Sequence, residues 1–339
     1  MNSTVTFPES ASEKVALRPA GFKEYVAIAR PDHWFKNIFM LPGMLFAFLV
    51  YDTTLDFSLL LRIIVGIVST CLIASANYTI NEYLDAEFDR YHPEKKKRSA
   101  VMTVLSPAYV YSEYILLAML GLGLAYFISL QFLAIEAFLL FMGIMYNVRP
   151  FRTKERVYLD VLSESVNNPI RLALGWFIFV PAAILPASLL DPAWAFIPPS
   201  SIIVAYWMGG AFLMATKRFA EYRYIDNPEL AGLYRKSFKR YTENNLLISM
   251  FFYALTSAFF LGIFLIKNKV ELLISFPFFA LLFAWYLKIG LRKDSVVQGP
   301  EKLHKEKSFM LFVILFTILL MGLVYVDIPA LNWFLKQSF

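Results

Sequence analysis

The amino-acid sequence predicts an all-α integral membrane protein, a bundle of nine transmembrane helices with its N-terminus in the cytoplasm. Of the 339 residues, 58% are hydrophobic and only 17% are charged, whereas soluble domains have about 45–50% apolar and about 25% charged residues. The apolar residues form continuous runs, which favours helices over a β-barrel with its alternating pattern. The Lys and Arg residues gather in every second connecting segment, a pattern that indicates the orientation in the membrane.

The first 30 residues are polar and mixed in charge. They lack the apolar core and the small-residue cleavage site of a signal peptide. We expect residues 1–30 to stay in the cytosol, with 22–29 forming a helix at the membrane surface. Residues 31–339 are expected to form a single transmembrane domain.

Nine apolar runs, each of roughly 15–27 residues, predict the spans, because about 20 residues are needed to cross the ~30 Å hydrocarbon layer. Some of the connections between them are very short, and others are long and polar. We expect function to reside among the long connections, which have room to build a site. The predicted spans are 37–51, 58–81, 108–128, 130–148, 158–184, 197–216, 245–266, 270–289 and 308–327.

The distribution of basic residues predicts the topology. The N-terminal segment and the connections after the second, fourth, sixth and eighth predicted spans together hold 27 of the 32 Lys and Arg residues. Because cytoplasmic segments are enriched in Lys and Arg, all five segments are expected on the cytoplasmic side. The remaining five basic residues are Arg62, Arg171, Lys267, Lys269 and Lys336.

Several classes of site are excluded by composition. Cys71 is the only cysteine, so no intrachain disulfide can form. The three histidines, His33, His92 and His304, are too scattered to form a zinc site. The net charge of +6 is explained by the cytoplasmic side of a membrane protein, and no nucleic-acid partner is expected.

A polar stripe follows the second predicted span. Asn77, Asn81, Asp85 and Asp89 are each four residues apart, so on a helix they lie on one face over a length of about 18 Å. Carboxylate and amide oxygens without thiolate or imidazole suit Mg²⁺, which binds one or two carboxylates together with substrate phosphates. We therefore predict Asp85 and Asp89 as metal ligands, supported by Asn81.

A solvated helix end is the alternative explanation of this stripe. The two asparagines argue against it, because they continue the stripe into the apolar segment, where unpaired amides are costly. Lys95 and Arg98 follow shortly afterwards and would supply cations that hold phosphate oxygens.

These residues resemble the UbiA superfamily of intramembrane transferases, whose second helix ends in Asn-x-x-x-Asn-Asp-x-x-Asp-x-x-x-Asp. The match consists of Asn77, Asn81, Asp85 and Asp89, with Glu82 where the family has Asp. The resemblance implies a nine-helix UbiA-like fold with a Mg²⁺-dependent site at the cytoplasmic end of the second helix.

Within this superfamily the chain looks most similar to the decaprenyl-phosphate phosphoribosyltransferases. Ring prenyltransferases of the superfamily carry a second Asp-x-x-x-Asp motif after the sixth helix, whereas residues 217–226 of this chain replace most of those acids by cations. The matching segments between residue 30 and about residue 245 are Arg30-Pro31-x-x-Trp34-x-Lys36-Asn37, Asp89-Arg90-x-His92-Pro93-x-Lys95-x-x-Arg98, Asp160-Val161-Leu162, Pro169-Ile170-Arg171-x-x-x-Gly175 and Lys217-Arg218-x-Ala220-Glu221.

The resemblance implies transfer of 5-phosphoribose from 5-phosphoribosyl 1-diphosphate to a polyprenyl, decaprenyl-like phosphate, with release of diphosphate. It implies an enzyme of the inner cell membrane with its active site on the cytoplasmic side. Asn81, Asp85 and Asp89 would be both the metal ligands and the catalytic residues. The residues expected to bind substrates are Lys36, Asn77, Lys95, Arg98, Tyr146, Asp160, Arg171, Lys217, Arg218 and Glu221.

Alternatives stay open for some of these residues. Lys217 and Glu221 are four residues apart and could pair with each other. Arg171 could form a structural pair with Glu164 or Asp160. His92, before Pro93, is more simply a helix-end cap than an acid. Most of the basic residues around Tyr146, namely Arg149, Arg152 and Lys154, are better explained as anchors on the cytoplasmic face.

Two other functions are compatible with the sequence. The first is transfer of an isoprenoid from a prenyl diphosphate to an aromatic acceptor, against which the missing second acidic motif argues. The second is lipid transport without catalysis, since buried polar stripes also occur in transporters. The carboxylates and clustered cations at one face fit two bound anions better than a path across the membrane.

Overall fold

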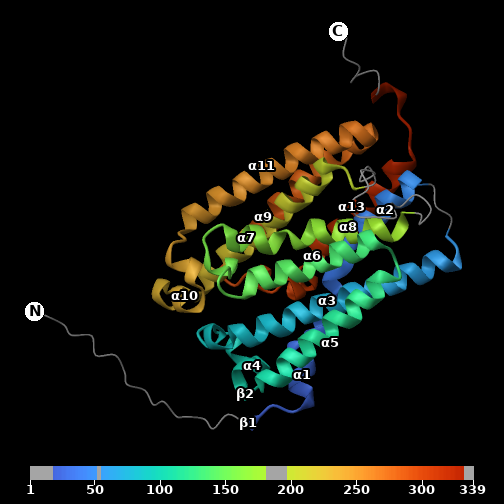
Figure 1. Cartoon of the computed structure of the whole chain (residues 1–339). Coiled ribbons are helices and arrows are strands. Elements are labelled where there is room, and N and C mark those ends of the chain that lie inside the picture. The colour runs from blue at the N-terminus through green and yellow to red at the C-terminus, as the bar shows by residue number, and fades with distance from the viewer. Residues whose placement is uncertain (1–17, 52–54, 181–196, 332–339) are drawn as a thin grey trace, which may run out of the picture.

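Helices form nearly all of the regular structure in residues 18–51, 55–180 and 197–331, which are the residues that the computed structural model describes (Figure 1). The only strands among them are β1 (Arg18–Pro19) and β2 (Thr103–Val104), which pair in parallel. Most of the N-terminal segment predicted to be cytosolic, residues 1–17, lies outside the described residues.

The longer helices follow one another through short helical turns in the connections. The short turns are η2 (Lys95–Lys97), α4 (Ser99–Met102), η3 (Thr153–Glu155), η6 (Lys236–Lys239), η7 (Val270–Ser275), η8 (Val296–Gln298) and η9 (Pro300–Lys305). The other helices are α1 (Phe22–Ile28), η1 (Pro31–Met40), α2 (Leu41–Tyr51), α3 (Phe57–Asp89), α5 (Pro107–Tyr126), α6 (Leu130–Asn147), α7 (Leu159–Ser165), α8 (Asn167–Phe179), α9 (Ser200–Ile225), α10 (Pro228–Tyr234), α11 (Glu243–Asn268), α12 (Phe276–Gly290) and α13 (Lys307–Tyr325).

Every predicted span coincides with one or two of these helices. Six helical segments of the described chain are long and apolar enough to cross a membrane, namely α3, α5, α6, α11, α12 with η7, and α13. The other three predicted spans correspond to η1 with α2, to α7 with α8, and to α9. The protein is therefore a multi-pass helical membrane protein, while the count of nine spans and the cytoplasmic N-terminus stay predictions.

The fifth predicted span is divided into two helices. Pro169 lacks an amide hydrogen, so it cannot donate the helical hydrogen bond to the carbonyl of Ser165. The chain turns at Val166, between α7 and α8. This break separates the polar helix α7, which carries Asp160 and Glu164, from the apolar helix α8.

Two apolar clusters hold the bundle together. One contains buried residues of α2, α3, α6 and α8, such as Met44, Phe132 and Leu174. The other joins α9 to α10, α11 and α12 through residues such as Phe219 and Tyr253. Large apolar side chains on the outer faces of α5, α11 and α13 are exposed, as expected for a surface that faces lipid.

The contact between α2 and α8 depends on two glycines. A Cβ atom at Gly175 would lie 2.0 Å from the backbone oxygen of Met40, and one at Gly43 would lie 1.9 Å from that of Leu172. The two helix backbones therefore approach each other closely, as small residues permit in membrane bundles.

We predict that Gly175→Ala destabilises the protein by about 1–3 kcal/mol, because an added methyl group forces the backbones of α2 and α8 apart. The expected result is a melting temperature several degrees lower in detergent, measured by tryptophan fluorescence. Gly123→Ala on α5 is the control, since no atom lies within 4 Å of a Cβ atom at that position. Equal melting temperatures for the two variants would show that the close approach is not required.

Candidate active site

A cavity opens at the end of the bundle where α3 and α6 end. It is lined by residues of η1, α3, the connection after α3, α6, η3, α7, α9, α10 and η6. The cavity has a volume of about 110 Å³ and is open to solvent at its mouth.

The charge of the lining is strongly unbalanced. Ten lining residues are basic and only five are acidic, so the cavity carries an excess of five positive charges when all ionise. Such an excess in a concave site attracts anions. The acids are Glu82, Asp85, Asp89, Glu155 and Glu164, and the bases are Arg30, Lys36, Lys95, Arg98, Arg152, Lys154, Lys217, Arg218, Arg235 and Lys236.

The predicted polar stripe on α3 divides into two parts. Asn81, Asp85 and Asp89 line the cavity. Asn77, one turn earlier, lies against Gly143 of α6 and donates a 3.0 Å hydrogen bond to the backbone oxygen of Leu139. The structure therefore brings three members of the stripe together and uses the fourth in the contact between α3 and α6.

Asp85 is paired with two cations from the connection after α6. Its carboxylate lies 2.5 Å from Nζ of Lys154 and 3.1 Å from a guanidinium nitrogen of Arg152. These two cations are only 5% and 7% exposed, so their interpretation as membrane anchors was wrong, while Arg149 is exposed. Burial lowers the pKa of Lys154 to about 8, although the Asp85 carboxylate acts in the opposite direction.

Asp89 and Glu82 share the guanidinium of Arg98. The distances from this guanidinium to the two carboxylates are 2.7 Å and 3.3 Å. Glu82 lies also 3.5 Å from Arg30. Arg98 was predicted to bind phosphate. In the structure it faces the acidic stripe inside the cavity.

The donor set on α3 fits a magnesium ion held together with a substrate. Asp85, Asp89 and Asn81 offer only oxygen and amide groups, and all three face the cavity. No group of three or more His, Cys, Asp or Glu residues in the described part of the chain forms a complete metal site. A site with two carboxylates, completed by water and phosphate oxygens, is the arrangement that Mg²⁺ commonly adopts.

Lys95 lies in the connection after α3 and contacts residues of α9 and α10. Its ammonium group lies 3.0 Å from the Glu221 carboxylate and also donates to the Tyr234 hydroxyl. Burial opposes the charge on Lys95, but the carboxylate of Glu221 raises its pKa. His92 accepts hydrogen bonds from the backbone amides of Glu94 and Lys95 through Nδ1, so it caps the start of the turn η2 and not the end of α3.

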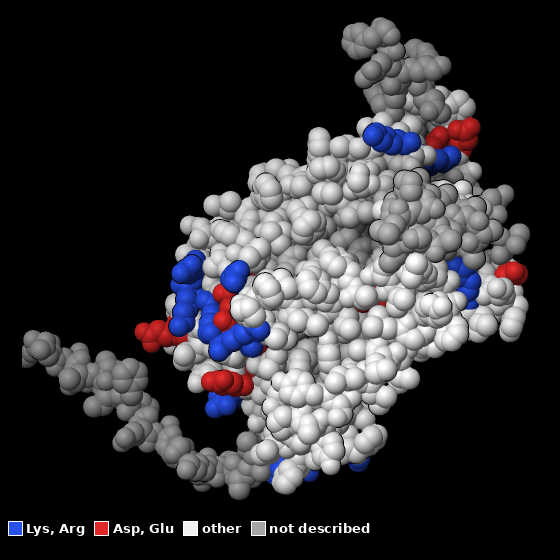
Figure 2. Space-filling view, in the orientation of Figure 1, with Lys and Arg blue, Asp and Glu red and all other residues white. Residues whose placement is uncertain are grey.

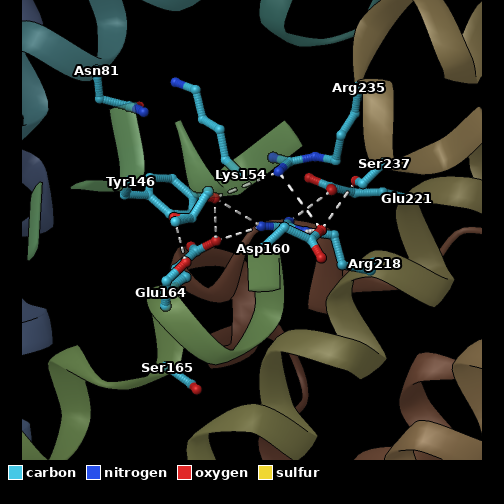
Figure 3. Close-up of polar contacts among 12 residues, drawn as sticks. Asn81, Tyr146, Lys154, Asp160, Glu164, Ser165, Arg218, Glu221, Arg235 and Ser237 are labelled. Carbon is cyan, nitrogen blue, oxygen red and sulfur yellow. Dashed lines mark hydrogen bonds and ion pairs between the residues drawn. The ribbon is translucent and has the colours of Figure 1, made fainter. Parts of the chain in front are cut away.

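Arg218 is the centre of a buried ion-pair network (Figure 3). Its guanidinium contacts Glu164, Glu221 and Asp160, the last two at 3.0 Å and 3.4 Å. It also donates a 3.2 Å hydrogen bond to Tyr146. Arg218 is only 1% exposed, so most of its charge is neutralised by acids of the protein itself.

Asp160 lies behind the cavity wall. It accepts hydrogen bonds from Tyr241 at 2.7 Å and Ser237 at 3.1 Å, and Arg235 lies 4.0 Å away. Neither Asp160 nor Glu221 belongs to the cavity lining. Both therefore hold the basic residues of the wall in place.

Lys217 differs from its neighbour Arg218. It lines the cavity, and within the described residues no carboxylate lies within 4 Å of its ammonium group. The pair with Glu221 considered from the sequence does not form, because Glu221 contacts Lys95 and Arg218. Lys217 is therefore positioned to accept an anion that enters the cavity.

Lys36 and Arg171 occupy different environments. Lys36 lines the cavity beside His33, with its ammonium group 2.9 Å from the imidazole Nδ1. Arg171 is buried outside the lining and donates a 2.9 Å hydrogen bond to the Asn37 side chain. The ion pair with Glu164 or Asp160 considered from the sequence is absent among the described contacts, since both acids bind Arg218.

Sequence reasoning did not assign several residues that line the cavity. The sequence predicted no role in the site for Arg30 or Arg235, and it favoured anchors at the membrane surface for Arg152 and Lys154. Arg30 and Arg152 both have left-handed backbones, with φ of 52° and 32°. Residues in this region of φ/ψ space concentrate at functional sites, but a single sequence carries no signal for it.

Comparison with known proteins identifies a family and several relatives of the chain. The chain matches the family described as the UbiA prenyltransferase family over residues 39–300. It is 28% identical over 224 residues to a decaprenyl-phosphate phosphoribosyltransferase of Mycolicibacterium smegmatis, covering 65% of this chain and 63% of that protein. It is 27% identical over 240 residues to a protein of the same name from Mycobacterium tuberculosis, covering 69% of this chain and 72% of that protein.

Solved structures with a similar fold also exist. A UbiA homolog from Archaeoglobus fulgidus bound to GPP and Mg²⁺ superposes with a TM-score of 0.63 at 19% sequence identity, covering 89% of this chain and 100% of that chain. Digeranylgeranylglyceryl phosphate synthase superposes with a TM-score of 0.55 at 13% identity. At such low identity these structures support the fold alone.

Proposed function

This chain belongs to the UbiA prenyltransferase family, and on that premise we propose that it transfers 5-phosphoribose from 5-phosphoribosyl 1-diphosphate to a polyprenyl phosphate. The observation that carries this proposal is the cavity, in which an acidic stripe on α3 faces ten basic residues. Two phosphorylated substrates require more positive charge than a prenyl diphosphate and an aromatic acceptor that carries no phosphate. The names of the mycobacterial relatives support the same activity.

The donor would bind over the stripe on α3. A Mg²⁺ ion held by Asp85 and Asp89 with Asn81 would neutralise the charge that develops on the departing diphosphate. Arg98, which lies beside Asp89, and Lys95 also line the cavity and would hold the phosphate oxygens of the donor. Because Arg98 is already oriented by Asp89 and Glu82, little reorganisation is needed when the diphosphate binds.

The acceptor phosphate would bind at Lys217 and Lys36, which also line the cavity. Its oxygen is already anionic, so its attack on C1 of the ribose requires no strong general base. The bond between C1 and the diphosphate oxygen breaks, and a bond between C1 and the lipid phosphate oxygen forms. The carboxylates of the lining would stabilise the positive charge that develops on the ribose ring.

A membrane location suits both substrates. The polyprenyl chain would stay among the lipid-facing helices, and the sugar diphosphate would arrive from water at the end of the bundle where the cavity opens. We propose that this end faces the cytoplasm, because the basic connections cluster there, and that the enzyme resides in the inner cell membrane.

The test is a transfer assay with purified protein in vesicles, Mg²⁺, labelled 5-phosphoribosyl 1-diphosphate and decaprenyl phosphate. We expect a labelled lipid whose formation stops when the metal is chelated. The competing activity is tested with a labelled prenyl diphosphate and an aromatic acid. Product from the second pair, but none from the first, would refute the proposal.

We predict that Lys217→Gln raises the KM for the polyprenyl phosphate by roughly tenfold or more, because it removes a cation that pairs with no acid of the protein. The melting temperature should not fall. Arg223→Gln, which removes a cation of the same helix outside the cavity lining, is the control. A raised KM for the donor instead would assign Lys217 to the sugar diphosphate.

A further inference from the structure

A second concave surface adjoins the cavity and is also basic. Its wall comes from residues 149–157 and from 236–240, two segments about 80 residues apart in the sequence. Figure 2 shows Lys and Arg side chains gathered at the end of the molecule where α10 lies in Figure 1. We call this surface the basic hollow and define it by its cations, which are Arg149, Arg152, Arg156, Lys236, Lys239 and Arg240.

Most of these cations have no acidic partner. Glu155 is the only acid of the hollow, and it pairs with Arg152 and Lys236 at 2.8 Å each. The other four cations form no ion pair within the described residues, and all four are exposed. A cytoplasmic location accounts for cations on this face, but it does not require six of them to converge on one hollow around a single acid.

The hollow and the cavity share part of their walls. Arg152, Glu155 and Lys236 line both, so the ion pair between Glu155 and Lys236 stands at the boundary. Arg152 also contacts Asp85, the predicted metal ligand in the cavity. An anion leaving the hollow at this boundary would therefore meet the acidic stripe and its cations directly.

We propose that the basic hollow captures the water-soluble phosphorylated substrate and delivers it to the cavity. The chemistry recognised is a molecule with several phosphate groups, for which the four unpaired cations raise the local concentration and the rate of association. The identity of this substrate as a sugar diphosphate rests on the proposed function. An anionic lipid headgroup offers the same phosphate chemistry from the membrane side, and the experiment separates the two sources.

The experiment neutralises three exposed cations of the hollow that do not line the cavity, Arg156→Gln, Lys239→Gln and Arg240→Gln, in one variant. At an ionic strength of about 20 mM we expect kcat/KM for the sugar diphosphate to fall by about tenfold. The loss should shrink strongly at about 300 mM salt, where the charges are screened. The kcat and the KM for the polyprenyl phosphate should stay unchanged.

The control variant removes the same number of charges elsewhere, by Lys96→Gln, Lys97→Gln and Lys305→Gln. These lysines are exposed, lie outside both concave surfaces and take part in no described ion pair. An equal loss in the control would overturn the proposal, because general attraction would then suffice. A loss seen only in vesicles with anionic lipid, and absent in neutral detergent, would assign the hollow to a lipid headgroup instead.

A binding measurement keeps this test independent of the reaction. Inorganic diphosphate is titrated into the purified protein in neutral detergent by calorimetry, and we expect the triple variant to bind it several-fold more weakly than wild type and control. If the protein used a prenyl diphosphate, the proposed function would fail while this measurement would still test the hollow. Equal affinities in all three proteins would refute the capture of phosphate.

Discussion

Replacing Asp85 or Asp89 by asparagine is expected to reduce turnover by at least about 10²–10³-fold, the loss typical of removing one preorganised electrostatic group from an active site. Both carboxylates line the cavity on one face of α3. Each substitution would remove one of the negative charges that we propose hold the metal ion. The measurement is the rate of labelled lipid formation at saturating Mg²⁺. The Mg²⁺ concentration for half-maximal activity should rise in any variant that keeps measurable turnover.

Glu87→Gln is the matched control, since Glu87 lies on the same helix between the two aspartates but is exposed and outside the cavity. It should retain nearly full activity. The aspartate variants should remain monodisperse in detergent, which separates a loss of chemistry from a loss of folding. Turnover close to wild type in both aspartate variants would remove the metal assignment.

Replacing Arg218 by glutamine is expected to destabilise the protein by about 3–5 kcal/mol, the cost of breaking a buried ion-pair network. Arg218 contacts three carboxylates, those of Asp160, Glu164 and Glu221. Without the guanidinium, these acids lose their shared partner in a buried setting. The measurement is thermal unfolding in detergent, and the expected result is a melting temperature lower by several degrees, or a failure to purify as folded protein.

A second substitution keeps this prediction testable if the single variant does not fold. Arg218→Gln combined with Glu164→Gln removes the charge of the one acid that pairs with no other cation among the described residues, and it should recover part of the lost stability, because the two residues are coupled. Lys217→Gln, next to Arg218 in sequence, should leave the melting temperature nearly unchanged. Similar stability of the Arg218 and Lys217 variants would contradict the distinction between a structural and a ligand-binding cation.

Two neighbouring basic residues of α9 show which properties of the site could not be predicted from the sequence. Lys217 and Arg218 look equivalent in the sequence, and both were predicted to bind substrate. In the structure Lys217 faces the cavity without an acidic partner, whereas Arg218 is surrounded by acids. The difference could not be predicted, because it depends on the acids of α7 that pack beside the end of α9.

The acidic stripe shows the opposite situation. The spacing of Asn81, Asp85 and Asp89 is a local property of one helix, so their common face could be predicted from 3.6 residues per turn. The predicted helices likewise agree with the structure because hydropathy is read over about 20 consecutive residues. The spacing does not predict the position of Asn77, which follows the same pattern but packs against Gly143 of another helix.

Local patterns in the chain were thus sufficient for the membrane setting, the position of nearly every helix and the acidic face of α3, since each depends on residues a few positions apart. Packing alone decided the pairing of charges between segments that are far apart in the sequence. Lys95 binds Glu221 across 126 residues, and Arg218 binds Glu164 across 54. Burial makes such pairs obligatory, because an unpaired charge inside the protein is costly, yet nothing in the local sequence specifies which acid will neutralise which base.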